Sequence, residues 1–595
     1  MSRLPRLLVV FTAVLVVGSG GRALAGQLPP SLSAGPEIAF VDVNTITLND
    51  DAVRRDQVVL VRHGRIVATG SRSQIPVPAS ATVIQGGGRY LVPGLTDSHV
   101  HLDGDGTRVG TSRDNFGDGP LYLAYGVTSV VNLRGFPQHL EWRRRVEDGT
   151  LVGPTIYTAG DFVNEPRVVT PDDVRRDIEA QVAAGYDLIK FREVYSREAG
   201  FLTTEGLSLE SYRSLSEVTR ELGVPLTGHA PVNLGLDALL ESGQALAHIG
   251  ALSEIHFLPM LNHPMWLGVT AMAFFVLTVI AVTSGLATIT NRWRVLPPPP
   301  KAVSRVRELA GLQLLAAAIA AASAILFLPG GPLFESATLR VAFTVMLVLV
   351  AAATTAIVFA MVTIWSEHDT SRAARVQAVA ASVAGVALAW AAFAFWVPVI
   401  WRSSDRGIDL VAGRLRDAGT TVQTTLVAYD AVGGPGRRLL ASDPAIDFLQ
   451  PSVRARWRRL RPAAPRLRYT NFMKKLAGAL HRAGVPLVAG TDAMGYPLVT
   501  PGASLHRELE LLVASGLSPY EALRTATTAA ARFLRRPAEF GRVAPGLRAD
   551  LILVDGNPLE DIARLREPFG VMARGRWYPR EELHGMLMDL AADSD

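Results

Sequence analysis

Cysteine is absent from this chain and lysine is rare. The 595 residues include no cysteine, which excludes disulfide scaffolds, thiolate zinc sites, cysteine-ligated iron–sulfur clusters and cysteine nucleophiles. The net charge is only +5 over this length, so nucleic acid is not expected as a partner. Of the 59 basic residues, the lysines are Lys190, Lys301, Lys474 and Lys475.

Charged residues of either sign are also scarce. They make up 19% of the chain, whereas hydrophobic residues make up 49%. These values argue against disorder, and the length predicts several folded units. The mean hydropathy of +0.23 is high for a wholly water-soluble protein, so part of the chain is expected to lie in a bilayer.

Four central stretches contain no charged residue, and each is about 20 residues or longer. A helix of that length, rising about 1.5 Å per residue, crosses a hydrocarbon core of about 30 Å. Residues 264–401 are therefore predicted to form a four-helix transmembrane insertion, with buried helices of a soluble core as the weaker alternative. The stretches are Pro264 to Thr290, Leu309 to Leu328, Val341 to Trp365 and Val376 to Trp401.

Residues 1–26 have the pattern of a signal peptide or an uncleaved N-terminal anchor. A basic start precedes an apolar run and the small-residue sequence Ala23-Leu24-Ala25, which predicts export. Basic residues in the loops after the first and third apolar stretches are expected to stay in the cytoplasm. The predicted location is therefore the cell (inner) membrane, multi-pass, with the catalytic domain on the extracytoplasmic, periplasmic side.

The remaining sequence alternates strand-like and helix-like segments. Residues 36–92 and 540–580 contain short apolar runs separated by turn residues, which predicts a small β-sandwich formed by both termini. Between them, the fold class is predicted to be α/β, with residues 93–263 and 402–539 forming a (β/α)8 TIM-type barrel. Active sites of such barrels lie at the carboxyl ends of the strands, so polar residues there are the candidates.

Histidines and an aspartate end several of the predicted strands. His99 and His101 alternate on one strand, so their side chains lie on the same face. His229, His248 and Asp492 follow later strands, and imidazoles with a carboxylate suit a divalent ion such as zinc. Each residue alone has a structural alternative, as a core histidine or a helix N-cap.

Lys190 ends another predicted strand, where an ammonium group would repel a metal ion. Burial in an apolar strand favours the neutral amine. That amine can react with carbon dioxide to give a carbamate, whose two oxygens suit a bridge between two metals. The structural alternative is a lysine whose stem packs on apolar neighbours.

In these motifs the chain resembles the amidohydrolase superfamily of metal-dependent hydrolases, specifically the branch that contains imidazolonepropionases and Xaa-Pro (prolidase-like) dipeptidases. The resemblance covers about residues 36–263 and 402–580. The inserted membrane module has no counterpart in that branch that suggests its role. The matching segments are 92–101, 187–190, 228–230, 489–493 and the run from His506 to Leu551.

The resemblance implies two divalent metal ions, with Zn2+ as the expected species. His99, His101 and Asp492 would hold one ion, His229 and His248 the other. Carboxylated Lys190, formed with CO2, would bridge them. Imidazolonepropionases use one metal and lack this lysine, so the chain is more similar to the two-metal dipeptidases. Residues 130–133 read Val-Val-Asn-Leu where relatives often carry Arg-Asp, so no role is carried over for that pair.

The activity implied by the resemblance is hydrolysis of a carbon–nitrogen bond in an amide, a cyclic amide or a dipeptide by metal-activated hydroxide. Asp492 would accept the water proton and pass it to the leaving nitrogen. The alternatives are hydrolysis of N-acylated, lipid-like amides presented by the membrane, and an inactive receptor or scaffold barrel. Further candidates for substrate contact are His506, Tyr195, Arg192 and Arg134.

The expected partners are a small amide or dipeptide and the lipid bilayer. A second copy of the chain stays open as a further partner. Two alternative roles are expected for the membrane insertion: anchoring of the enzyme, or presentation of substrate from the membrane.

Overall fold

The structure is a computed structural model, and it describes most of the chain. The described ranges are 37–102, 116–196, 203–257, 337–366, 371–391, 401–433, 436–460 and 467–592, with isolated helical residues between 272 and 311. The predicted leader, residues 1–26, lies outside the described residues, as do most of the predicted membrane stretches 264–290 and 309–328.

Strands from both ends of the chain form one eight-stranded sheet, in the order β18-β17-β16-β5-β1-β2-β3 with β4 also paired to β1. The predicted sandwich is thus a single hydrogen-bonded sheet, because β1 changes partner along its length, from β4 to β5. The bounds are β1 Ile38–Ile46, β2 Val53–Arg62, β3 Arg65–Ser71, β4 Thr82–Gln85, β5 Tyr90–Pro93, β16 Leu551–Val554, β17 Gly570–Ala573 and β18 Arg576–Pro579.

The central part of the chain forms a closed parallel barrel. One sheet has the order β6-β7-β8 and another the order β15-β14-β13-β12-β9. Parallel bridges join Ala159 to Leu188 and Val100 to Ala493, so the two sheets connect at both edges and close the circuit. The bounds are β6 Leu95–Val100, β7 Val127–Asn132, β8 Thr155–Thr158, β9 Ile189–Phe191, β12 Leu226–Gly228, β13 Ala245–Leu246, β14 Val422–Gln423 and β15 Leu487–Val488.

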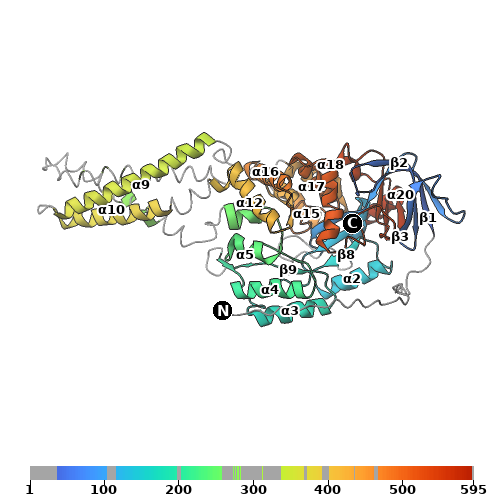
Figure 1. Cartoon of the computed structure of the whole chain (residues 1–595), viewed down its shortest axis with the longest axis horizontal. Coiled ribbons are helices and arrows are strands. Elements are labelled where there is room, and N and C mark those ends of the chain that lie inside the picture. Colours follow the sequence, from blue (N-terminus) through green and yellow to red (C-terminus); the bar gives the residue numbers. More distant parts are fainter. Residues whose placement is uncertain are drawn as a thin grey trace, which may run out of the picture.

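Helices connect successive strands on the outside of the barrel (Figure 1). Several begin with a side-chain cap, such as Thr170 before α3 and Ser518 before α18, which satisfies backbone N–H groups that the first turn leaves free. The bounds are α1 Gly119–Ala124, α2 Pro137–Glu147, α3 Pro171–Ala183, α4 Leu209–Glu221, α5 Gly235–Ser242, α12 Asp405–Asp417, α13 Leu426–Gly433, α14 Arg437–Ala441, α15 Pro451–Arg458, α16 Leu467–Ala483, α17 Ala503–Ala514, α18 Pro519–Thr525, α19 Thr528–Phe533 and α20 Arg580–Ala592.

Short elements complete the chain. A two-stranded ribbon of β10 (Val194–Ser196) and β11 (Thr203–Glu205) follows β9. The π-helical turn η1 (Ser253–Phe257) follows β13, and the 3-10 turns η4 (Pro444–Phe448) and η5 (Ile562–Arg566) lie near the C-terminal half of the barrel. The barrel and its helices share one large apolar core.

The insertion after β13 contains a helical hairpin, α9 (Ala337–Ser366) and α10 (Arg372–Ala391), that extends away from the barrel on the side opposite the terminal sheet (Figure 1). Within the described residues, one helix is long and apolar enough to cross a membrane, at Arg340–Ser366, and Arg375–Trp390 is a shorter apolar helix. The predicted four-helix insertion is therefore not supported, because its first two stretches lie mostly outside the described residues and α10 is described over too short a length.

Candidate active site

Six predicted residues converge at the carboxyl ends of the barrel strands. His99 lies within β6 and His101 directly follows it, while Lys190 lies within β9. The other three residues lie shortly after the ends of strands: His229 after β12, His248 after β13 and Asp492 after β15. In a parallel barrel the carboxyl ends of all strands meet at one rim, so these residues become neighbours despite their separation in sequence.

Asp492 lies at the centre of this cluster. One of its oxygens, Oδ1, is 3.0 Å from His101 Nε2 and 3.6 Å from His99 Nε2. The other, Oδ2, is 3.7 Å from His248 Nε2. His229 joins the group through His248, with ring centroids 5.0 Å apart. The ligand atoms of His99, His101 and Asp492 all lie within 4.8 Å of one another, which is close enough for one cation to contact all three.

The backbone at this rim adopts conformations that most residues avoid. His248, Thr425, Asp492 and Met494 have φ values of +68°, +44°, +61° and +66°. Left-handed conformations at residues other than glycine cost about 1–3 kcal/mol each and are concentrated at functional sites. Here they turn the chain sharply after three strands, which directs side chains inward over the barrel.

Gly495 packs against the same cluster. A Cβ atom at this position would lie 2.4 Å from Asp492 Oδ1 and 3.0 Å from His101 Cδ2. Any larger residue would therefore push the aspartate or the histidine out of place. The close approach of the backbone keeps the two ligand-type side chains together.

Three histidines of the cluster, His99, His229 and His248, are neutral in this environment. Burial lowers the pKa of His99 and His229 well below the usual value, and the charge of Lys190 lowers both further. Burial also lowers the pKa of His248 to about 4, although Asp492 acts in the opposite direction. A neutral imidazole keeps a nitrogen lone pair free for a metal.

Asp492 is ionised. Burial alone would raise its pKa, but the hydrogen bond from His101 and the positive charge on the protonated fraction of Lys190 lower it to about 2. The cluster therefore contains an anion beside several imidazoles, which is the donor set that zinc and similar divalent ions prefer.

Lys190 is fully enclosed, with 1% of its surface exposed. Its Nζ atom has no hydrogen-bond partner among the described residues. Burial lowers the pKa of Lys190 to about 7, against the attraction of Asp492. A substantial fraction of neutral amine is therefore present near neutral pH, and this nitrogen is nucleophilic.

These residues fit a divalent cation. His99 Nε2 is, like Lys190 Nζ, buried without a hydrogen-bond partner among the described residues, and both face a buried carboxylate. Unsatisfied buried polar atoms are costly. A cation held by the imidazoles and Asp492 would satisfy His99 Nε2.

Gln423, at the end of β14, orients His99. Its Oε1 atom lies 3.2 Å from His99 Nδ1, and its amide donates to the Ser98 carbonyl at 2.7 Å. Thr425 orients His248 in the same way, because Thr425 Oγ1 lies 3.0 Å from His248 Nδ1. Such outer contacts fix which imidazole nitrogen faces the metal. Sequence analysis missed both residues, because a glutamine and a threonine in a short strand carry no distinctive motif.

We expect replacement of Gln423 by Ala to weaken metal binding by about 10–100-fold. The substitution removes the Gln423 oxygen that fixes the His99 ring through Nδ1. It does not remove His99 Nε2, the nitrogen that would bind the metal. The measurement is metal affinity by competition with a chromophoric chelator, alongside the melting temperature. Unchanged metal affinity, or a loss that only parallels unfolding, would contradict this role for Gln423.

Asp97 connects the two strands that carry the metal-ligand triad. Its Oδ1 atom accepts hydrogen bonds from the His99 and Thr491 N–H groups at 3.3 and 3.0 Å, and its Oδ2 accepts from the Thr491 hydroxyl at 2.6 Å. The carboxylate thereby holds β6 against the segment after β15. Its position fixes the distance between His99 and Asp492.

Glu508, on α17, is buried behind this layer. It accepts hydrogen bonds from the Thr424 hydroxyl and from the Val427 N–H at 2.7 Å. Burial raises its pKa from an ordinary value of 4.5 to about 7. The folded protein therefore binds a proton between about pH 4.5 and pH 7 that the unfolded chain releases.

It follows that Glu508 makes unfolding free energy fall as pH rises through this window. Between pH 5 and pH 8 the wild type is expected to lose up to about 3 kcal/mol more than Glu508→Gln, which does not titrate. Chemical unfolding of both proteins at the two pH values measures the difference. Parallel pH dependence in the two proteins would show that Glu508 titrates normally.

A cavity of about 300 Å³ opens over the cluster. It is lined by five of the six residues, with Arg134 and Arg192 among the other lining groups. Both guanidinium groups lie 5.1 Å from the centroid of the Phe162 ring, and Arg134 is also 3.6 Å from Asp161. The predicted arginines are thus at the cavity. Lining residues that sequence analysis missed are Phe162, Glu254, Tyr429, Tyr469, Met494 and Tyr496.

The other two predicted substrate contacts have different outcomes. The side chain of Tyr195 lies outside the described side chains. His506 does not line the cavity: it is buried on α17, and its Nε2 lies 2.8 Å from the Tyr125 carbonyl. Tyr125 precedes β7, at the amino ends of the strands, so His506 is at the opposite end of the barrel from the metal-ligand cluster. The prediction for His506 is not supported by the structure.

Asn132 lies in the segment where many relatives carry an Arg-Asp pair, and in this chain its side chain makes structural hydrogen bonds. Its side-chain oxygen accepts from the Leu102 N–H at 3.2 Å. Its amide donates to the Arg134 carbonyl at 2.7 Å and to Thr158 Oγ1 at 3.0 Å. Asn132 therefore holds together the ends of β6, β7 and β8, which is a structural task.

Comparison with known proteins links part of the barrel to one family. Residues 454–578 match the amidohydrolase family. The chain is 33% identical over 121 residues to ochratoxinase from Aspergillus niger, which is 20% of this chain and 23% of that protein. It is 31% identical over 124 residues to dihydroorotase from Bacillus caldolyticus, covering 20% of this chain and 28% of that enzyme. The matched segments thus span about a quarter of these relatives' length.

Solved structures share the fold over nearly the whole chain. A bottromycin amidohydrolase superposes with a TM-score of 0.54 at 19% identity, covering 95% of this chain and 92% of that chain. Molinate hydrolase gives a TM-score of 0.52 at 16% identity, with coverages of 93% and 96%. A Xaa-Pro dipeptidase gives 0.51 at 15% identity, with coverages of 91% and 100%. Residues 454–578 are thus similar to the amidohydrolase family, and the solved structures show that the chain shares their α/β fold.

Proposed function

We propose that this protein is a metal-dependent amidohydrolase that cleaves a carbon–nitrogen bond in a small amide, cyclic amide or dipeptide. The observation that carries the proposal is the convergence of His99, His101 and Asp492, with ligand atoms within 4.8 Å of one another. His229, His248 and Lys190 lie at the same rim. The similarity to ochratoxinase and to amidohydrolases of known structure supports the same reaction class.

The metal centre would have two parts. His99, His101 and Asp492 would hold one divalent ion, and His229 and His248 a second, with zinc as the favoured species. When bound, such ions polarise a carbonyl and make water acidic enough to act near neutral pH.

Asp492 is suited to proton transfer. Its carboxylate is ionised and lies beside the imidazoles, with 4% of its surface exposed toward the cavity. A base in this position can take a proton from the attacking water and return it to the departing nitrogen, which leaves poorly unless it is protonated.

Lys190 is proposed to carry a carbamate. The neutral Nζ lone pair would attack the carbon of CO2, forming an N–C bond and opening one C–O π bond, and the loss of one N–H proton would leave an anionic carbamate in place of the neutral amine. The support is its burial, its lack of a partner among the described residues and its pKa of about 7. The carbamate oxygens would then lie at the rim that carries the metal-ligand histidines.

Arg134 and Arg192 are proposed to bind a carboxylate on the substrate, because two guanidinium groups meet at Phe162 at the edge of the cavity. Arg134→Gln is expected to raise KM about tenfold for a substrate with a free carboxylate, the equivalent of about 1.4 kcal/mol. The matched amide-capped substrate, which has no charge to lose, is the control. An equal rise for both substrates would contradict carboxylate recognition.

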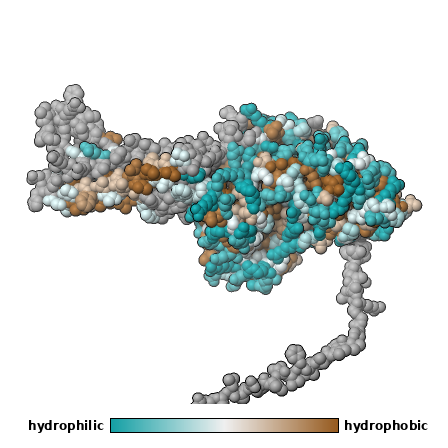
Figure 2. All heavy atoms as spheres, turned by 45° about the horizontal axis from the view of Figure 1, so that its top comes forward, coloured by the Kyte–Doolittle hydropathy of each residue, from teal (hydrophilic) through white to brown (hydrophobic). Residues whose placement is uncertain are grey.

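The hairpin of α9 and α10 is proposed to tether the enzyme to a membrane. Its two helices meet along a seam of small and aliphatic residues that includes Ala360, Ala381 and Ile357. Much of its described outer surface is apolar, as the brown and tan residues in Figure 2 show, and Phe359, Val376 and Val383 are each more than 60% exposed. An apolar exterior over a small-residue interior is expected for lipid-facing helices.

A second candidate substrate class follows from the position of this hairpin. The insertion leaves the barrel after β13 and returns before β14, the strands whose ends carry His248 and Thr425. Membrane-derived N-acylated amides could then reach the cavity from the bilayer. This candidate and the first share the same metal chemistry and differ only in the substrate.

The test is a hydrolysis screen of the full-length, detergent-solubilised protein loaded with Zn2+ or Mn2+. Dipeptides, N-acyl amino acids with short and long acyl chains, and cyclic amides are compared. His101→Ala should lose both bound metal and turnover, whereas His481→Ala, a histidine paired with Glu521 elsewhere, should retain both. Wild-type protein that binds no metal would favour an inactive scaffold and sink the proposal.

A further inference from the structure

A second hollow lies at the opposite end of the barrel from the metal-ligand cluster. It has a volume of about 570 Å³ and is bordered by Leu226, Ala245, Thr421 and Leu487. Each of these residues lies at or next to the amino end of its strand, from β12 through β15. Because the metal-ligand residues follow the carboxyl ends of these strands, this hollow is separate from the catalytic cavity.

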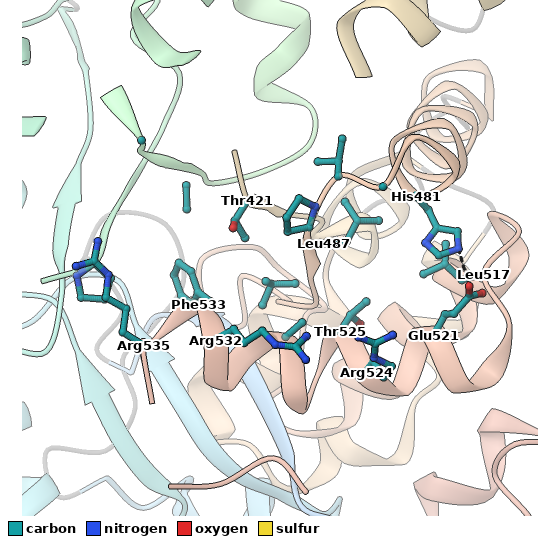
Figure 3. Close-up of a pocket in the computed structure, with 18 of the residues that line it drawn as sticks. Thr421, His481, Leu487, Leu517, Glu521, Arg524, Thr525, Arg532, Phe533 and Arg535 are labelled. Atoms are coloured by element: carbon teal, nitrogen blue, oxygen red, sulfur yellow. Dashed lines mark ion pairs between the residues drawn. The ribbon is translucent and has the colours of Figure 1, made fainter. Parts of the chain in front are cut away.

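The floor of the hollow is apolar. Leu226, Val485, Leu487, Leu517 and Phe533 line it, and each is buried. Figure 3 shows two of these side chains, Phe533 from the end of α19 and Leu487 from β15. A concave apolar surface of this volume falls within the range of small-molecule sites, about 300–1,000 Å³.

Three arginines lie at the border of the same hollow: Arg524, Arg532 and Arg535. In the view of Figure 3, the Arg532 side chain extends toward Arg524, and Arg535 lies beyond Phe533. Arg524 packs on the Tyr520 ring at 5.6 Å. No ion pair is found between any of these three arginines and a carboxylate of the described residues, although carboxylates elsewhere in the barrel pair with arginines such as Arg143 and Arg507.

The acidic residue that lines the hollow, Glu521, is already engaged. It accepts hydrogen bonds from the Ser518 N–H and hydroxyl, both at 2.8 Å, which caps α18. It also lies 3.1 Å from His481 Nε2, as the dashed line in Figure 3 marks. The hollow therefore presents uncompensated positive charge beside an apolar surface.

We propose that this hollow is a binding site for a small organic carboxylate with an apolar body. The apolar part would rest on Phe533 and Leu487, and the carboxylate would accept charge-assisted hydrogen bonds from Arg524 and Arg532. Planar guanidinium groups are well matched to a carboxylate, and the apolar floor excludes water from one side. The site is independent of the hydrolytic function proposed above.

The experiment measures binding of 4-phenylbutyrate to the full-length protein in detergent by ligand-detected NMR and calorimetry. Wild type is expected to bind it saturably. The double variant Arg524→Gln/Arg532→Gln should bind at least tenfold more weakly, while Arg459→Gln, an exposed arginine outside both cavities, should bind as wild type does. Melting temperatures of all three proteins check that they fold.

Two further probes separate the contributions of charge and apolar surface. The neutral analogue 4-phenylbutanamide should bind at least tenfold more weakly than the carboxylate, and inorganic phosphate alone should not compete at equal concentration. The proposal is overturned if 4-phenylbutyrate fails to bind, if the double variant binds it equally well, or if the amide matches it. Binding that is lost only in His101→Ala would place the carboxylate at the metal-ligand cluster instead.

Discussion

Replacement of Asp492 by Asn is expected to lower kcat/KM by about 10²–10⁴-fold, the range of a lost general acid–base group. The amide has nearly the same shape as the carboxylate and keeps one oxygen toward His101, which lies 3.0 Å from Asp492 Oδ1 in the wild type. It cannot accept a proton at neutral pH. The measurement is steady-state kinetics on the substrate found in the screen.

The metal content of Asp492→Asn distinguishes the role of Asp492 in proton transfer from its role as a metal ligand. Because four histidines remain in place, most of the metal should stay bound in Asp492→Asn, as determined by elemental analysis of the purified protein. Loss of all metal would make Asp492 primarily a ligand. Retained turnover with retained metal would remove it from the proton-transfer step altogether.

Replacement of Lys190 by Ala should abolish stable binding of at least one metal ion, and activity with it. If the side chain carries a carbamate, the substitution removes the anion between the two histidine groups and leaves a cavity in a position that is 1% exposed. Metal-to-protein ratios of wild type and variant, each dialysed under the same conditions, provide the measurement. An active, fully metallated Lys190→Ala protein would refute the bridging role.

Two controls make this result specific. Lys190→Met preserves most of the side-chain volume without a reactive nitrogen, so it should fold like the wild type and still lose metal. Lys474→Ala changes a lysine on α16, outside both cavities, and should change neither quantity. Wild type prepared with ¹³C-labelled bicarbonate should give a carbamate carbon signal that is absent from Lys190→Met.

The residues at the strand ends could be found in the sequence because their signal is local. His99 and His101 alternate on an apolar strand, and Lys190 is one of very few lysines and ends another such strand. Alternation decides which side chains share a face, and the parallel βα order decides which ends share a rim. Both properties follow from neighbours in the chain, so the α/β barrel and the candidate ligands were predictable.

Residues whose roles come from distant partners could not be found this way. Gln423 contacts His99 across more than three hundred positions, and nothing around it in the sequence indicates that contact. His506 lies close in sequence to Asp492, yet α17 carries it back to the amino ends of the strands, beside Tyr125.

The amino-acid sequence by itself determined the α/β alternation, the set of imidazole, carboxylate and amine groups at strand ends, and the apolar character of the insertion, because each depends on residue type and short-range spacing. Tertiary structure alone decided that β6 closes on the segment after β15, which brings Asp492 to His101. It also created the arginine-bordered hollow at the other end of the barrel. Closure of the barrel brings together residues that are hundreds of positions apart in the sequence. No local sequence pattern specifies which of these distant residues become neighbours.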